Sequence, residues 1–127
     1  MNADKQVVNE TTSSIIACAF QVANGLGCGF VEKVYENALA HELRKKGVSV
    51  LQQHNLTVTY DGVEVGEFAT DLLVEGSVLV ELKAAKALDD VHVAQCLNYL
   101  KASGLSICLL INFGNPRIEV RRLVRDF

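Results

Sequence analysis

The chain has 127 residues, of which 50% are hydrophobic and 21% are charged, and its composition excludes wholesale disorder. A chain of this length fits one domain over residues 1–127, and folding buries roughly two-thirds of the surface that the unfolded chain exposes. Because the formal net charge is −3, no global positive field attracts nucleic acid, and such binding would need a local patch or a metal ion.

Two helices are expected at the start of the chain. Apolar residues recur at helical spacing over residues 7–24, and the run Gly25-Leu26-Gly27-Cys28-Gly29 ends this helix. A second helix is expected over residues 30–46, where Leu39 and Leu43 continue one face, and Gly47 ends it. Residues 11–31 carry no charge, but polar residues and glycines interrupt them, so this stretch is too polar to span a bilayer.

Alternation of apolar and polar residues predicts strands from residue 48 onward. Asp61-Gly62 is typical of a hairpin turn between two such runs. Residues 68–74 and 78–83 are expected to form strands joined by a turn at Glu75-Gly76-Ser77. A helix over residues 91–102, a strand over 107–113 that is covered on both faces, and a strand over 117–124 complete the order. The predicted fold class is α/β, with a central sheet flanked by helices.

Two carboxylates and one lysine lie on the two strands that the Gly76 turn joins. Asp71 interrupts an apolar run, and Glu81 and Lys83 are two residues apart on a strand, so both point to the same face. Brought together, these groups suit Mg²⁺-assisted hydrolysis of a phosphoester, with Mn²⁺ as a substitute. The alternative is a structural ion pair between Lys83 and one carboxylate, which the apolar surroundings of Asp71 disfavour.

The second predicted helix offers a third carboxylate. Glu32, Tyr35 and Glu36 lie at helical spacing and share a face with Leu39 and Leu43. Glu32 is the candidate metal ligand, and Glu36 is interpreted as a surface residue or a member of a salt bridge. Tyr35 is either a substrate-binding group or a core ring whose hydroxyl is satisfied internally.

Gln95 and Tyr99 form the fourth candidate feature. They are one helical turn apart, so both can face the carboxylates across the sheet edge. There they would bind a phosphate or a base, or orient Lys83. The alternative, an exposed Gln95 beside a core Tyr99, fits the spacing equally well.

The run Gly29-Phe30-Val31-Glu32-Lys33-Val34-Tyr35-Glu36 resembles the motif that names the GxxExxY protein family, whose members look like small PD-(D/E)XK nucleases. The similarity covers almost the whole chain and includes Thr70-Asp71-Leu72-Leu73-Val74, Val80-Glu81-Leu82-Lys83, residues 95–100 and Leu110-Ile111-Asn112-Phe113-Gly114. It implies a restriction-endonuclease-like core with an extra N-terminal helix. Thr70 stands where the superfamily name has proline.

The resemblance also implies roles for the candidate residues. It assigns Mg²⁺ binding to Asp71 and Glu81, action at the attacking water to Lys83, and the acidic helix position to Glu32. It matches Gln95 and Tyr99 to the Gln-x-x-x-Tyr motif of exonuclease-like members.

Three functions follow from these features. The leading hypothesis is a Mg²⁺-dependent nuclease that cuts DNA. The second is a nucleic-acid-binding or protein-interaction module of the same fold without useful catalysis, and the third is a hydrolase of small nucleotides or phosphoesters. A homodimer would suit duplex cleavage, and a partner protein could bring the substrate.

Composition bears on where the protein acts and what it binds. With five Phe and three Tyr, no stacking platform for bases is evident, and Arg117, Arg121, Arg122 and Arg125 either contact phosphates or form a solvated edge strand. The four cysteines are expected to be buried free thiols in a reducing cytoplasm.

Overall fold

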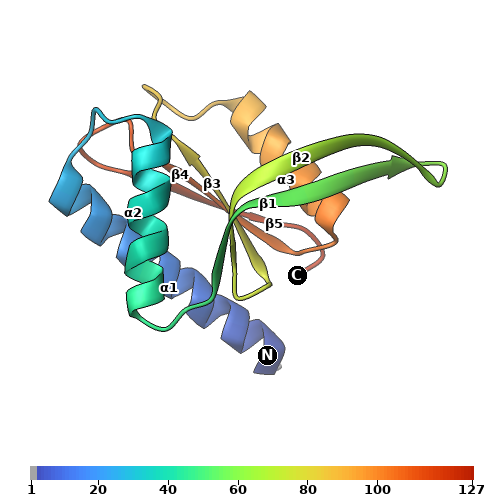
Figure 1. Ribbon diagram of the computed structural model, residues 1–127, viewed down its shortest axis with the longest axis horizontal. Coiled ribbons are helices and arrows are strands. Elements are labelled where there is room, and N and C mark those ends of the chain that lie inside the picture. Colours follow the sequence, from blue (N-terminus) through green and yellow to red (C-terminus); the bar gives the residue numbers. More distant parts are fainter. Residues whose placement is uncertain (1–2) are drawn as a thin grey trace.

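The computed structural model describes residues 3–127, which form helices and strands in the predicted order (Figure 1). The elements are α1 (Ala3–Leu26), α2 (Glu32–Lys45), β1 (Val50–Tyr60), β2 (Val63–Val74), β3 (Val78–Lys83), α3 (Asp90–Ser103), β4 (Ile107–Asn112) and β5 (Glu119–Val124).

The strands make one mixed sheet in the order β1-β2-β3-β4-β5, in which β3 and β4 run parallel and the other neighbours are antiparallel. Figure 1 shows α1 and α2 on one side of this sheet and α3 on the other. The prediction of an α/β fold with a mixed sheet between helices, including the N-terminal helix, is confirmed.

Apolar clusters on both faces hold the sheet between its helices. All six residues of β4 are buried, as expected for a strand covered on both sides. Leu109 and Ile111 join the cluster under α1 and α2, whereas Cys108 and Leu110 join the cluster under α3. Since side chains alternate along a strand, β4 ties the two halves of the core together.

The turn between β2 and β3 brings the two candidate strands side by side. Glu75 and Gly76 adopt φ values of 53° and 64°, a left-handed pair that reverses the chain, and the Ser77 N–H donates to the Val74 carbonyl at 3.1 Å. Glu75, Gly76 and Ser77 thus form the loop, Val74 pairs with Val78, and β2 runs antiparallel to β3. Asp61 and Gly62 are also left-handed and form a two-residue turn between Tyr60 of β1 and Val63 of β2, so both predicted turns are confirmed.

α1 extends beyond the predicted helix over residues 7–24 at both ends, and polar residues inside it are satisfied by its own backbone. The Thr11 and Thr12 hydroxyls donate to the carbonyls of Val7 and Val8, each at 3.0 Å. Asp4 lies in the first turn, where a negative charge favours the helix N-terminus. Among the described residues, no helix is long and apolar enough to cross a membrane.

The cysteines follow the prediction at three positions of four. Cys18, Cys96 and Cys108 are buried free thiols. Cys28 is exposed, so its predicted burial is wrong. The reason is local, since Cys28 stands between Gly27 and Gly29, both at positive φ, in the loop that joins α1 to α2.

β1 and β2 extend well beyond the part of the sheet that β3 completes. β3 pairs with β2 at residues 72–74, and residues 55–69 form a projecting two-stranded hairpin, here called the arm (Figure 1). Residues 63–69 of β2 are all exposed. At its base the arm packs against α3, where the rings of Phe68 and Tyr99 lie 5.4 Å apart.

Candidate active site

Asp71 and Glu81 meet where β2 and β3 separate. The last backbone pair before this fork is Leu72 with Val80, and the next residue on each strand is one of the two acids. The Asp71 backbone N–H donates to Glu81 Oε1 at 3.0 Å, and the Leu82 N–H donates to Asp71 Oδ2 at 2.8 Å. At the fork, carboxylate oxygens thus accept the hydrogen bonds that backbone carbonyls accept elsewhere in the sheet. These bonds hold the two side chains beside each other.

Burial makes this pair of acids hard to ionise. Glu81 is 4% exposed, and desolvation, followed by the charge of Asp71, raises its pKa to about 8. The pKa of Asp71 is also raised, mainly by burial, against the hydrogen bonds from Leu82 and Gln53. Both acids would be stabilised as anions by a nearby cation.

The donor chemistry of the pair fits Mg²⁺, which binds hard oxygen ligands and commonly uses one or two carboxylates while retaining several waters. Within residues 3–127, no three Asp, Glu, His or Cys side chains are gathered in a metal-binding arrangement. The oxygen donors brought into direct proximity are therefore those of Asp71 and Glu81.

Lys83 lies on the same face of β3 as Glu81. Its Nζ donates to Gln95 Oε1 at 3.1 Å, and its charge lowers the pKa of both acids. Tyr99, one turn along α3 from Gln95, is buried, and desolvation followed by the charge of Glu81 raises its pKa to about 12. The phenol therefore keeps its proton at neutral pH and can donate a hydrogen bond. Gln95 thus contacts Lys83 directly, and Tyr99 lies close enough to Glu81 and Asp71 for their charges to help raise its pKa.

The loop that follows Lys83 is clamped by β4. Asn112, fully buried, pairs with Lys83 in the parallel ladder, and its side chain accepts from Ala85 N and donates to Ala85 O, each at 3.0 Å. The Phe113 N–H donates to the Lys83 carbonyl at 2.8 Å. These contacts fix the backbone that directly follows the lysine.

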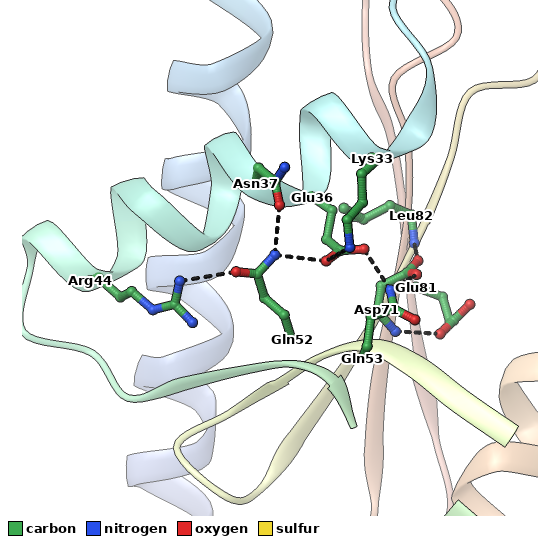
Figure 2. A network of polar contacts seen from close by, with 9 residues as sticks. All are labelled: Lys33, Glu36, Asn37, Arg44, Gln52, Gln53, Asp71, Glu81 and Leu82. Carbon is green, nitrogen blue, oxygen red and sulfur yellow. Dashed lines mark hydrogen bonds and ion pairs between the residues drawn. The ribbon is translucent and has the colours of Figure 1, made fainter. Parts of the chain in front are cut away.

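Glu36 corrects one of the sequence predictions. Its expected position on the surface is wrong, because it is 3% exposed, although its predicted membership of a salt bridge is confirmed by Lys33 at 3.0 Å. Gln52 and Gln53 each donate to one of its oxygens, at 2.7 and 2.6 Å (Figure 2). Glu36 thus anchors a polar network between α2 and β1.

Gln53 links that network to the fork. It lies opposite Asp71, at a point where β1 leaves the ladder with a φ of 52°. Its Nε2 donates both to Glu36 Oε1 and to Asp71 Oδ1, the latter at 3.3 Å (Figure 2). The left-handed backbone of Gln53 therefore places one amide between two carboxylates.

The other two helix candidates lie apart from this network. Glu32 is exposed at the start of α2, and its charge is the smallest contribution to the raised pKa of Glu81. Tyr35 is fully buried, its hydroxyl donates to the Gly27 carbonyl at 2.6 Å, and its ring stacks on Phe113 at 4.6 Å. Of the two alternatives for Tyr35, the structure therefore shows a core ring whose hydroxyl is satisfied internally, and this packing leaves it no access to substrate.

Comparison with protein families decides the relationship. Residues 9–123 match the profile of the PD-(D/E)XK nuclease superfamily. The chain belongs to that superfamily. The expected restriction-endonuclease-like fold, with its mixed sheet and N-terminal helix, is confirmed. The narrower resemblance to GxxExxY proteins stays a prediction.

Two solved structures share the PD-(D/E)XK fold. An alkaline exonuclease from Laribacter hongkongensis has a TM-score of 0.54 at 16% identity, covering 74% of this chain and 56% of that one. A protein designated SSO0001 has a TM-score of 0.55 at 12% identity, covering 75% of this chain and 50% of that one. This chain thus spans about half the length of both structures. No curated protein sequence matches it.

Sequence reasoning missed the part that three residues play in the site: Glu36, Gln53 and Asn112. A signal existed for Glu36, which shares a helical face with Leu39 and Leu43, and for Asn112, a polar residue ending an apolar run. The pair Gln52-Gln53 interrupts the apolar alternation between Val50 and Leu56, but no residue type there predicts a left-handed backbone.

Proposed function

We propose that the protein is a Mg²⁺-dependent nuclease that hydrolyses phosphodiester bonds of DNA, with Mn²⁺ as a substitute. The observation that carries the proposal is the meeting of Asp71 and Glu81 at the β2–β3 fork, with Lys83 on the same face. Membership of a nuclease superfamily agrees with it.

In this proposal each side chain has a separate task. Asp71 and Glu81 hold the metal ion, which when bound lowers the pKa of a water and offsets charge that develops on the phosphorus oxygens. Lys83, oriented by Gln95, places a positive charge beside the phosphate and the attacking water. Tyr99 donates its phenolic proton to a phosphate oxygen. Glu32 is assigned to the same site because its charge acts on Glu81.

The test is release of acid-soluble nucleotides from single- and double-stranded DNA in Mg²⁺, Mn²⁺ or EDTA. Wild type should be at least about 1,000-fold faster than the double variant Glu81→Gln, Lys83→Ala, since each change removes a group acting at the reaction centre. Glu10→Gln, an exposed exchange of the same chemistry on α1, serves as the control. Equal rates for wild type and the double variant would refute the proposal.

Calorimetry separates a nuclease from a binding module of the same fold. Titration of Mn²⁺ into the DNA-free protein should give heat that the Asp71→Asn variant loses, since the amide keeps an oxygen for Leu82 but removes the charge. Heat that is the same for both proteins would favour the module. Sedimentation at several concentrations tests the predicted homodimer.

A further inference from the structure

A groove between the arm and α3 leads away from the candidate active site. It consists of two hollows of about 740 and 330 Å³ that share Phe68 and Asn98 in their walls. The smaller hollow is also lined by Gln95 and Tyr99. Gln95 accepts a hydrogen bond from the Lys83 ammonium group, and the charge of Glu81 contributes to the raised pKa of Tyr99. The groove therefore opens beside the reacting groups and runs outward along the arm.

Three aromatic side chains from different elements line this groove. Tyr60 from β1 and Phe68 from β2 are 75% and 42% exposed, and Tyr99 from α3 lies with its ring 5.4 Å from that of Phe68. The sequence, in which aromatic residues are few and far apart, gave no sign of such a platform. Exposed ring faces bind nucleic acid bases by stacking, whatever the base.

Polar groups in the groove suit the rest of a nucleotide. The amides of Gln95 and Asn98 can donate to and accept from base edges, and Lys101 can contact a phosphate. Among the described residues that line the two hollows, Lys101 is the one that carries a charge. The acidic residues of the arm, Asp61, Glu64 and Glu67, are outside this lining.

The charges of the arm favour one strand over two. Duplex DNA carries one negative charge per ~1.7 Å of axis, against ~3.4 Å for each strand, so a duplex would be repelled more strongly by the three arm carboxylates. The bases of a duplex are also already stacked and paired, whereas an unpaired base is free to stack on Phe68.

We propose that this groove binds unpaired nucleotides of single-stranded DNA, which stack on Phe68 beside Tyr99 and lead the strand to the fork of Asp71 and Glu81. The direction of the strand rests on the proposed nuclease function, but the binding itself does not. Phe68 is the central contact because its ring is shared by both hollows.

The test is binding in EDTA, where no cleavage occurs, of a single-stranded oligonucleotide carrying the fluorescent base 2-aminopurine. Stacking should quench the fluorescence of this base on wild type. Phe68→Leu, which stays apolar but loses the ring, should weaken binding about 5- to 100-fold, and Phe68→Trp should restore it. Val63→Ala, an exposed apolar residue of the arm outside the groove lining, should bind as wild type.

Three results would overturn the inference: unchanged binding by Phe68→Leu, equal affinity for a blunt duplex of the same length, or a dimer in sedimentation that Phe68→Leu dissociates. The last result would make a second copy of this chain the occupant of the groove. If wild type cleaves DNA but Phe68→Leu binds single strands as tightly as wild type, the proposed role of the groove is refuted and the proposed nuclease function is not. If Phe68→Leu weakens binding of single strands but wild type cleaves no DNA, the proposed nuclease function is refuted and the proposed role of the groove is not.

Discussion

Glu81→Gln should make the metal-free protein more stable at neutral and alkaline pH. The glutamine keeps an oxygen for the Asp71 N–H and has nearly the same shape, but it removes a carboxyl group that must take up a proton, or be buried as an anion beside Asp71, when the chain folds. The gain in stability should therefore depend on pH in a way that identifies its origin.

The magnitude follows from the pKa of Glu81, which burial raises from 4.5 to about 8. Because the folded chain holds this proton more tightly than the unfolded chain does, the carboxyl group favours folding below pH 4.5, and that advantage is lost as the pH rises to about 8. At about 1.4 kcal/mol per pH unit, the loss is about 3 kcal/mol at pH 7 and on the order of 5 kcal/mol above pH 8.

The assay is urea unfolding in EDTA between pH 4 and 9 for wild type, Glu81→Gln and the exposed control Glu10→Gln. Free energies of unfolding for wild type and Glu81→Gln should converge at the acid end and separate steadily toward pH 8. Parallel curves over the whole range would show that Glu81 titrates normally in the folded protein, and the reasoning about the fork would fail.

Three further changes test other parts of the site. Lys83→Met should lower the single-turnover cleavage rate at least about 100-fold while DNA affinity, measured in EDTA, changes less than about threefold. Gly114→Ala should cost about 3 kcal/mol or more in urea unfolding, because a Cβ there would run into the Ala85 carbonyl oxygen, whereas Gly66→Ala, with no atom within 4 Å of its Cβ, should cost about 1 kcal/mol or less. Gln53→Ala, which removes one amide from two carboxylates, should weaken Mn²⁺ binding about tenfold by calorimetry, and no change in affinity would contradict its positioning role.

The central part of the site could be predicted because short-range rules determine it. The Glu75-Gly76 turn sets β2 beside β3, and strand alternation puts Glu81 and Lys83 on one face. Both rules operate within a few residues, so the sequence contains the information directly. The position of Asp71 next to Glu81 follows from that turn and its register.

The supporting contacts could not be predicted because they join distant segments. Glu36 accepts hydrogen bonds from glutamines 16 and 17 residues away, and Ala85 is held by an asparagine 27 residues away. The groove is lined by Tyr60, Phe68 and Tyr99, which come from three different elements. The number of aromatic residues in the sequence therefore does not reveal that these three lie together. Where the fold, rather than the local pattern, sets the neighbour, sequence reasoning has no rule to apply.

The clamp from Asn112 has a consequence for the order in which the protein is built. The loop after Lys83 obtains its hydrogen-bond partners from Asn112 of β4. β4 pairs in parallel with β3, and α3 lies between these two strands in the sequence. Such long-range parallel pairing forms slowly compared with hairpins, so the arm can form while the lysine is still loosely held. During synthesis, residues up to Asn112 must leave the ribosome before this part of the site can take shape. Under the proposed function, a nascent chain would thus be unable to attack nearby nucleic acid until the segment up to Asn112 has emerged.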